Sequence, residues 1–259
     1  MMKPQFAGRF YPKSEKELKE KINSFNKSGK KEKVKGIIVP HAGYDFSGNT
    51  ANLVYSSVKQ EFETVVIVGT DHTGVGNCVS LEDFETPLGV LKNETEISAE
   101  ISGFLKKNNF EKEHSLEVQL PFIQAYFKDV KIVQIIIASG DYKELGKKIF
   151  QIIKKSGKKV LVVASSDFTH FGHYYSFVPK INIREIDQKV IDKILKFDIS
   201  GFLEEARKTT VCGTGAIAVC MEICKLMKAT KPEILSYVTS ADISGDTQNI
   251  VSYAGIVFS

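Results

Sequence analysis

Four of the five histidines in this chain lie in short polar motifs whose residue types could do chemistry. Histidine is the commonest metal ligand and the only side chain that ordinarily titrates near neutral pH. Three of the four motifs directly follow an apolar run that is typical of a buried strand, and polar groups at the carboxyl ends of strands form the sites of open α/β sheets. The sequence therefore predicts a site at one edge of a sheet. The four histidines are His41, His72, His114 and His170.

His41 and His72 occupy equivalent places after two of these predicted strands. Pro40 ends the first strand, because proline removes a backbone donor and restricts the residue before it. Asp71 stands beside His72 and could steady its loop or orient a ligand. Each histidine alone could simply satisfy a turn, but two of the same kind at two strand ends favour a shared site.

Cys212 precedes an apolar-periodic helix and is followed by Gly213-Thr214-Gly215. A thiol at a helix N-terminus feels the positive end of the helix dipole, so we expect its pKa to fall. A thiolate is both a nucleophile and a metal ligand. The alternative is that Cys212 is only a small residue at the entrance of a buried helix.

Asp167 and His170 lie three residues apart after another predicted strand. That spacing can place both side chains in one cleft, as a base and an acid or as partners of metal ligands. Asp167 could instead be a helix N-cap. His114 begins a predicted helix and is either a further member of the site or a surface cap. His173 has no motif support beyond its proximity to His170, and we expect it to be exposed or to contact the site only through other residues.

The elements that must position these residues alternate between strands and helices. Strands that are apolar throughout and alternate with helices predict a mostly parallel sheet covered on both faces, in one α/β domain over residues 1–259. The main predicted strands cover 34–39, 64–68, 131–137 and 159–164, with closing strands at 233–240 and 250–258. Two shorter strands around 79–81 and 89–91 are expected to form a hairpin or a sheet edge. Predicted helices begin near residues 14 and 47 and cover 96–107, 115–127 with a kink or a restart at Pro121, 142–154, 182–196, 198–207 and 213–228.

Composition excludes several classes of protein. The 35 Lys and Arg against 31 Asp and Glu give a net charge of +4, spread along the chain in runs such as 27–33. Lysines without interleaved aromatics indicate solvated loops and no nucleic-acid partner. No apolar stretch predicts a membrane span or a signal peptide, so a cytoplasmic protein with reduced cysteines is expected. Cys220 and Cys224 are interpreted as core packing. The absence of a Walker A motif disfavours nucleotide-driven phosphoryl transfer, and the absence of a GxSxG motif disfavours an ordinary serine hydrolase.

Several motifs together resemble the Memo family, whose prokaryotic members are called AmmeMemoRadiSam system protein B. They occur in the family's order and nearly span the chain: AGRFYP at 7–12, PHAGY at 40–44, EHSLEVQLPF at 113–122, SDFTH at 166–170 and CG at 212–213.

The resemblance implies a fold similar to the catalytic subunit of class III extradiol dioxygenases, which hold non-haem Fe(II) with two histidines and a glutamate. It carries a metal-binding set over to His41, His72 and Cys212, and further pocket residues to Asp167 and His170. A cysteine thus stands where a carboxylate would. The soft thiolate favours copper, or iron in another redox role, and catechol cleavage does not follow from the fold.

Three functions are open at this point. The first is a redox protein that holds Fe(II) or Cu at His41, His72 and Cys212, with Asp167 and His170 moving protons. The second is a binding module for a small molecule or an anionic phosphotyrosine-type peptide, working with a radical-SAM protein as the family naming implies. The third and weakest is a hydrolase with Cys212 as nucleophile and His170 as base, which requires the two side chains within hydrogen-bond reach.

Overall fold

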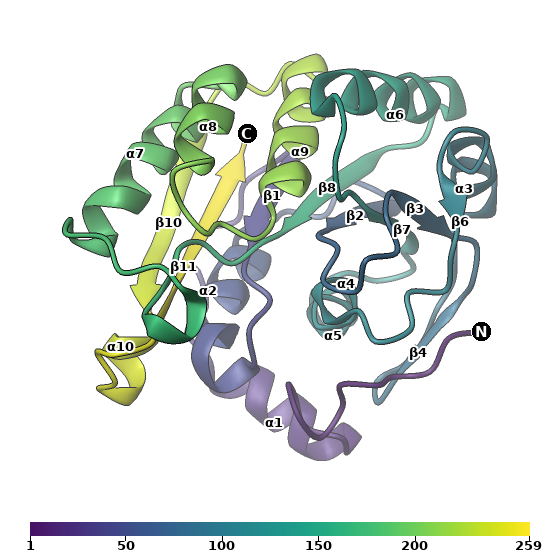
Figure 1. The fold of residues 1–259 in the computed structure, drawn as a ribbon. Helices are drawn as coiled ribbons and strands as arrows, with labels where there is room; N and C mark the ends of the chain where they lie inside the picture. Colours follow the sequence, from purple (N-terminus) through teal and green to yellow (C-terminus); the bar gives the residue numbers. More distant parts are fainter.

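Four parallel strands form the middle of a nine-stranded mixed sheet, in the computed structural model that describes all residues 1–259 (Figure 1). In spatial order they are β1 (Gly36–Val39), β8 (Val160–Ser165), β2 (Thr64–Gly69) and β7 (Lys131–Ile136). Their side chains are buried on both faces of the sheet, apart from Lys131 at the start of β7. This explains why the sequence shows continuous apolar runs here instead of alternation.

Antiparallel strands extend the sheet on both sides. β11 (Ile250–Phe258) pairs with β1 and with β10 (Pro232–Thr239), and a short β9 (His170–Phe171) pairs with β11. On the other side β3 (Cys78–Ser80) pairs antiparallel with β7 and parallel with β6 (Lys106–Lys107). A separate hairpin is formed by β4 (Phe84–Thr86) and β5 (Gly89–Leu91).

Helices cover both faces of the sheet (Figure 1). One face carries α3 (Thr95–Ile101), α6 (Tyr142–Ser156), α7 (Ile183–Leu195), α8 (Ile199–Ala206) and α9 (Thr214–Leu226). The other carries α1 (Glu15–Ser24), α2 (Tyr44–Ser57), α4 (His114–Glu117) and α5 (Leu120–Tyr126). Successive β2 residues alternate between the two cores, since Val66 and Val68 belong to the first and Val65 and Ile67 to the second.

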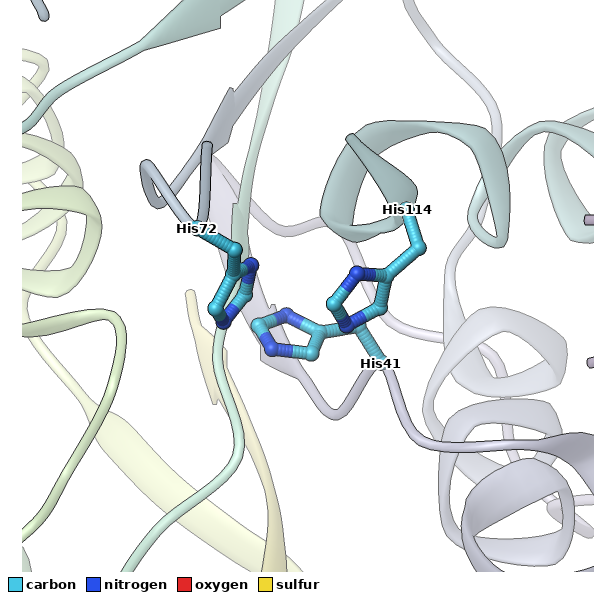
Figure 2. Close-up of side chains that lie close together, drawn as sticks. All are labelled: His41, His72 and His114. Atoms are coloured by element: carbon cyan, nitrogen blue, oxygen red, sulfur yellow. The ribbon is translucent and has the colours of Figure 1, made fainter. Parts of the chain in front are cut away.

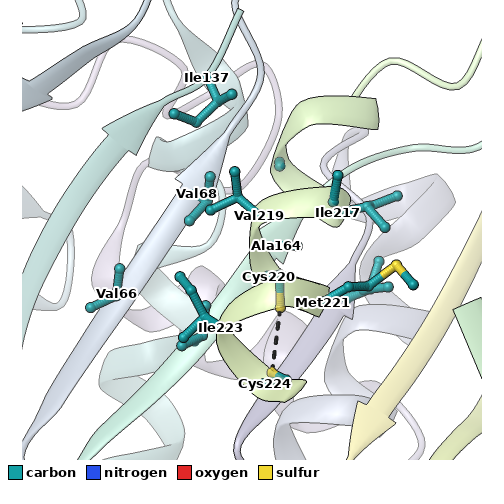
Figure 3. Close-up of a cluster of buried hydrophobic side chains, with 14 of the residues drawn as sticks. Val66, Val68, Ile137, Ala164, Ile217, Val219, Cys220, Met221, Ile223 and Cys224 are labelled. Atoms are coloured by element: carbon teal, nitrogen blue, oxygen red, sulfur yellow. Dashed lines mark hydrogen bonds between the residues drawn. The ribbon is translucent and has the colours of Figure 1, made fainter. Parts of the chain in front are cut away.

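Helix α9 lies against the middle of the sheet and is buried over most of its length (Figure 3). Cys220 and Cys224 on this helix have no exposed surface, and their Sγ atoms lie 3.9 Å apart as free thiols. The interpretation of these two cysteines as core packing is therefore confirmed.

The predicted mostly parallel α/β sheet with helices on both faces is confirmed, and several local predictions are corrected. Of the two alternatives for 79–81 and 89–91, the hairpin between them is wrong, because β5 pairs with β4, while the edge position is confirmed for β3, which is next to the last strand of the main sheet. The helix predicted over 96–107 ends at Ile101, and 106–107 form a strand. For residues 115–127 the predicted restart at Pro121 is confirmed: α4 ends at Glu117, and α5 begins at Leu120 with Pro121 in its first turn, where the missing N–H costs nothing. A short η1 (His173–Tyr175) and α10 (Ser240–Ser244) were not predicted.

The topology brings the polar motifs to one edge. Because β1, β2 and β8 are parallel, their carboxyl ends meet at the same side, and His41, His72 and Asp167 each follow one of them. Cys212 joins this edge at the start of α9, where its carbonyl accepts a hydrogen bond from Thr70 Oγ1 at 2.7 Å. None of the helices combines the length and apolarity needed to span a bilayer.

Candidate metal centre

Three imidazoles converge at this edge of the sheet (Figure 2). One ring nitrogen each of His41, His72 and His114 lies within 4.8 Å of the others. The ring centroids are 5.2 Å apart for His41 and His72, 5.2 Å for His41 and His114, and 4.5 Å for His72 and His114. The sequence left the place of His114 open, and the structure puts it inside the cluster.

Hydrogen bonding determines which nitrogen of His41 faces the cluster with a lone pair. Its Nδ1 lies 3.1 Å from Ser165 Oγ. That hydroxyl donates its only proton to the Ser115 carbonyl at 2.5 Å and accepts from Gln119 Nε2 at 2.9 Å. Ser165 can therefore only accept from His41, so Nδ1 carries the proton and Nε2 keeps its lone pair, which faces the Cys212 thiol at 3.2 Å.

His72 is oriented in the same way by a carboxylate. Glu113, whose side chain is completely buried, accepts from the backbone N–H of His72 at 2.8 Å and from its Nδ1 at 2.9 Å. It also caps α4 by accepting from Ser115 N at 2.8 Å. A carboxylate that receives Nδ1–H leaves Nε2 as the free nitrogen, the arrangement that metal-ligating histidines usually have.

The charges in the cluster suit a cation. Burial, followed by repulsion from His72, lowers the pKa of His41 to about 3. Burial, followed by repulsion from His41 and His72, lowers the pKa of His114 to about 3 as well. Burial alone would raise the pKa of Glu113, but the hydrogen bonds from His72 and Ser115 lower it to about 2. At neutral pH the site thus offers the uncharged imidazoles of His41 and His114 beside the negative charge of Glu113.

Cys212 borders the cluster on the side of His41. Its Sγ lies 3.2 Å from His41 Nε2 and 3.5 Å from the Asp167 carbonyl oxygen. Burial and the nearby Asp167 raise the pKa of this thiol far above its usual range. The prediction that the helix terminus lowers this pKa is wrong for the metal-free protein, because desolvation of a thiolate outweighs the dipole. Cys212 makes no hydrogen bond with His170, which removes the basis of the cysteine-hydrolase hypothesis.

Asp167 and His170 lie in the loop after β8. Asp167 is 4 % exposed, and its Oδ1 accepts from the backbone N–H of His41 at 2.7 Å, so it anchors the loop that carries a cluster histidine. Burial raises its pKa, although His170 acts in the opposite direction. No helix follows it, so the N-cap alternative is wrong. His170 Nδ1 faces the carbonyls of Phe168 at 3.0 Å and Thr210 at 3.2 Å, which leaves Nε2 without a protein partner.

The remaining predicted positions have simpler roles. The Asp71 carboxylate accepts four consecutive backbone N–H groups, from Thr73 to Gly76, so it steadies the loop beside His72. His173 is exposed at the start of η1, as expected.

Sequence reasoning missed the groups that orient the histidines. Ser165 and Gln119 look like ordinary strand and helix residues, and only their contacts with His41 reveal their role. In the sequence, Glu113 is only the first residue of the motif at 113–122. Its adjacency to His114 was the available signal, but its partner His72 lies 41 residues away.

The N-terminal segment covers the outer side of the cluster. The rings of Phe6 and Phe10 lie 5.6 and 4.9 Å from that of His114. The buried Glu117 holds the segment by accepting from the N–H groups of Gln5 and Phe6 and from the Tyr11 hydroxyl, at 2.7–2.9 Å. The cluster therefore has an apolar aromatic wall on the His114 side.

Three imidazole nitrogens with a neighbouring thiol form a donor set of intermediate to soft character. Such groups suit transition metals, whereas Mg²⁺ and Ca²⁺ prefer oxygen ligands. The residues present thus fit an Fe, Cu or Zn ion held by His41, His72 and His114, with Cys212 at its edge.

Comparisons with known proteins agree on one family. The family model described as Memo-like protein matches residues 2–257. The chain is 37% identical to a MEMO1 family protein of Pyrococcus abyssi over 98% of both chains. It is 38% identical to one of Nitrosopumilus maritimus over 99% of this chain and 98% of that one. An uncharacterized protein of Escherichia coli K12 is similar in fold, with a TM-score of 0.57 and 10% identity over 88% of this chain and all of that one.

Proposed function

The chain belongs to the Memo family, and from that premise we propose that it is a redox protein that holds one Fe or Cu ion at its three-histidine cluster. The observation that carries the proposal is the convergence of His41, His72 and His114, whose ring nitrogens lie within 4.8 Å of one another. Two of the three have Nδ1 engaged by Ser165 or Glu113, so that their Nε2 lone pairs are available to a metal.

Cys212 distinguishes this proposed centre from a purely nitrogen-ligated one. Its Sγ already lies 3.2 Å from the Nε2 of His41, so both atoms border the same space. A metal ion lowers the pKa of a coordinating thiol enough to deprotonate it. A bound thiolate favours copper, or iron in a redox role, over the harder metals. We propose His41, His72 and Cys212 as metal ligands, with His114 as the third histidine ligand of the same ion.

Asp167 and His170 are proposed as the proton-handling groups. His170 exposes an Nε2 without a protein partner, while its Nδ1 faces two backbone carbonyls that fix the ring. Asp167 is buried beside His41 and interacts with the charge of His170. When bound, the metal supplies an electron-transfer or Lewis-acid centre. His170 would take up or release a proton through Nε2, and Asp167 would stabilise its protonated form.

The charges do not favour the alternative occupant, an anionic peptide. An anion is held by cationic side chains or N–H donors. Here His41 and His114 are uncharged at neutral pH and Glu113 is negative. Without a metal ion, the negative charge of Glu113 would therefore repel a phosphotyrosine peptide.

Metal quantification after anaerobic, chelator-free purification tests the proposal. We expect Fe or Cu at up to one ion per chain, lost in His41→Ala and His72→Ala but retained in His173→Ala, a control in which an exposed histidine is removed. Co²⁺ binding then reports on Cys212, because a thiolate ligand gives an intense near-ultraviolet charge-transfer band that Cys212→Ser removes. A folded protein that binds none of Fe²⁺, Cu⁺ or Co²⁺ would refute the proposal, and binding without the sulfur band would exclude Cys212 as a ligand.

A further inference from the structure

At the edge of the sheet opposite the histidines, five lysines surround a hollow of about 340 Å³, here called the amino-edge hollow. Its floor is apolar and is formed by Val34, Phe62, Val160 and Met227. Its rim carries one glutamate, Glu61, besides the lysines. The lysines are Lys33, Lys35, Lys59, Lys158 and Lys159.

Parallel pairing of the strands gathers these distant residues. Lys35 directly precedes β1, Lys159 directly precedes β8, and Phe62 lies just before β2. These are three neighbouring parallel strands in the order β1, β8, β2, so their amino ends meet. Met227 caps the carboxyl end of α9, whose other end begins beside Cys212. The hollow and the proposed metal centre therefore lie at opposite edges of the sheet, and each can be tested without the other.

The hollow concentrates the positive charge of the protein. Its lining carries five lysines and one glutamate, and Glu94 and Glu96 pair with Lys158 from outside the lining, which leaves a local excess of +2. The sequence indicated that the excess charge is spread along solvated loops, and the structure shows that part of it converges.

Existing ion pairs show how the hollow receives carboxylates. Glu61 bridges Lys33 at 2.8 Å and Lys59 at 3.1 Å, and Lys158 pairs with Glu94 at 2.9 Å. Lys35 and Lys159 have no carboxylate partner within 4.0 Å. Two lysine ammonium groups beside an apolar floor are thus left for an external ligand.

We propose that the amino-edge hollow is a docking site for an acidic segment of a partner protein that carries an apolar side chain. Its carboxylates pair with Lys35 and Lys159, and its apolar side chain covers the floor between Phe62 and Val160. Charge complementarity steers such a partner and sets its register. Single-stranded nucleic acid fits less well, because it binds on exposed aromatic faces, and Phe62, the only aromatic residue in the lining, is 9% exposed.

The test uses the full chain and a fluorescein-labelled peptide with two glutamates on each side of one leucine. Fluorescence anisotropy at low salt measures its binding to the wild-type protein, to Lys35→Glu/Lys159→Glu and to Lys106→Glu/Lys107→Glu. The last variant is a matched control, since it reverses two exposed lysines on β6. We expect binding about tenfold weaker for the first variant, the size of a few surface ion pairs, and little change for the control. Replacing the leucine of the peptide by serine should also weaken binding to the wild-type protein.

Three outcomes would overturn the proposal. One is the absence of measurable binding, with circular dichroism and thermal unfolding showing that the proteins are folded. Another is an equal loss in both double variants, which would mean that only the net charge matters. The third is displacement of the peptide by a single-stranded oligonucleotide that itself binds more tightly, which would indicate a nucleic-acid surface.

Discussion

Replacing Glu113 by glutamine tests whether this carboxylate, through His72, tunes the histidine cluster for a metal. Glu113 accepts three N–H groups, from His72 N, His72 Nδ1 and Ser115 N, at 2.8–2.9 Å. Glutamine has one carbonyl oxygen, so its amino group must face at least one of these donors. The substitution also removes the negative charge that pairs with the His72 ring.

The expected losses of stability and of metal affinity follow from these contacts. A buried N–H left without an acceptor costs about 1–3 kcal/mol, which lowers the free energy of unfolding. Loss of the partner that orients a metal-ligating histidine typically weakens metal binding by about 10- to 100-fold. That corresponds to about 1.4–2.8 kcal/mol of binding free energy. We therefore expect Glu113→Gln to fold with reduced stability and to bind metal at least about tenfold more weakly.

A competitive titration of Co²⁺ against a chromophoric chelator measures this affinity. Glu111→Gln is the matched control, because it removes the same charge from an exposed side chain two residues away. Urea unfolding of the metal-free variants measures the cost in stability separately. If Glu113→Gln and Glu111→Gln bind Co²⁺ with equal affinity while both are folded, Glu113 does not tune the cluster and the reasoning is refuted.

Three further predictions concern stability. In the metal-free protein the pKa values of His41 and His114 are lowered to about 3, whereas unfolded histidine titrates near 6.5. Between the folded and the unfolded pKa values, only the unfolded state takes up these protons. The free energy of unfolding should therefore fall on acidification below pH 6.5, by up to about 1.4 kcal/mol per pH unit for each histidine. Urea unfolding at pH 7 and 5.5 checks this, and an unchanged pH dependence in His114→Gln would contradict it. Glu117→Gln should release the N-terminal segment and lower the free energy of unfolding by about 1–3 kcal/mol. Faster hydrogen exchange in residues 5–11 would show this release. Gly36→Ala should lower the free energy of unfolding by about 1–3 kcal/mol because its Cβ would overlap Cys224 Sγ, whereas Gly29→Ala, in open space, should be neutral in thermal unfolding.

Much of the fold could be predicted because its core strands carry a strong local signal. Each of the four parallel strands is an apolar run that ends in glycine, proline or a polar motif, and all four lie within two residues of their predicted bounds. The errors fall where strand pairing overrides the local helix propensity. The predicted helix over 96–107 ends early because its last residues pair with β3.

The candidate site was predictable in part for the same reason. His41, His72 and Asp167 follow strands, and parallel strands end at a common edge. His114 follows no strand. Its helix reaches the cluster because the Ser115 hydroxyl bonds the Thr70 carbonyl at 3.2 Å and its carbonyl accepts from Ser165. No periodicity encodes these contacts.

The amino-acid sequence by itself determined the strands, the helices and the residue types available at the strand ends, because these depend on neighbours along the chain. Only the tertiary structure decided which of those residues meet. It joined His114 to the other two histidines, assigned the Cys212 thiol to His41 instead of His170, and placed Glu113 against His72. It also collected lysines from three separate segments into one hollow. Contacts of this kind depend on strand order and register, which follow from burying both faces of the sheet at once and not from any local pattern.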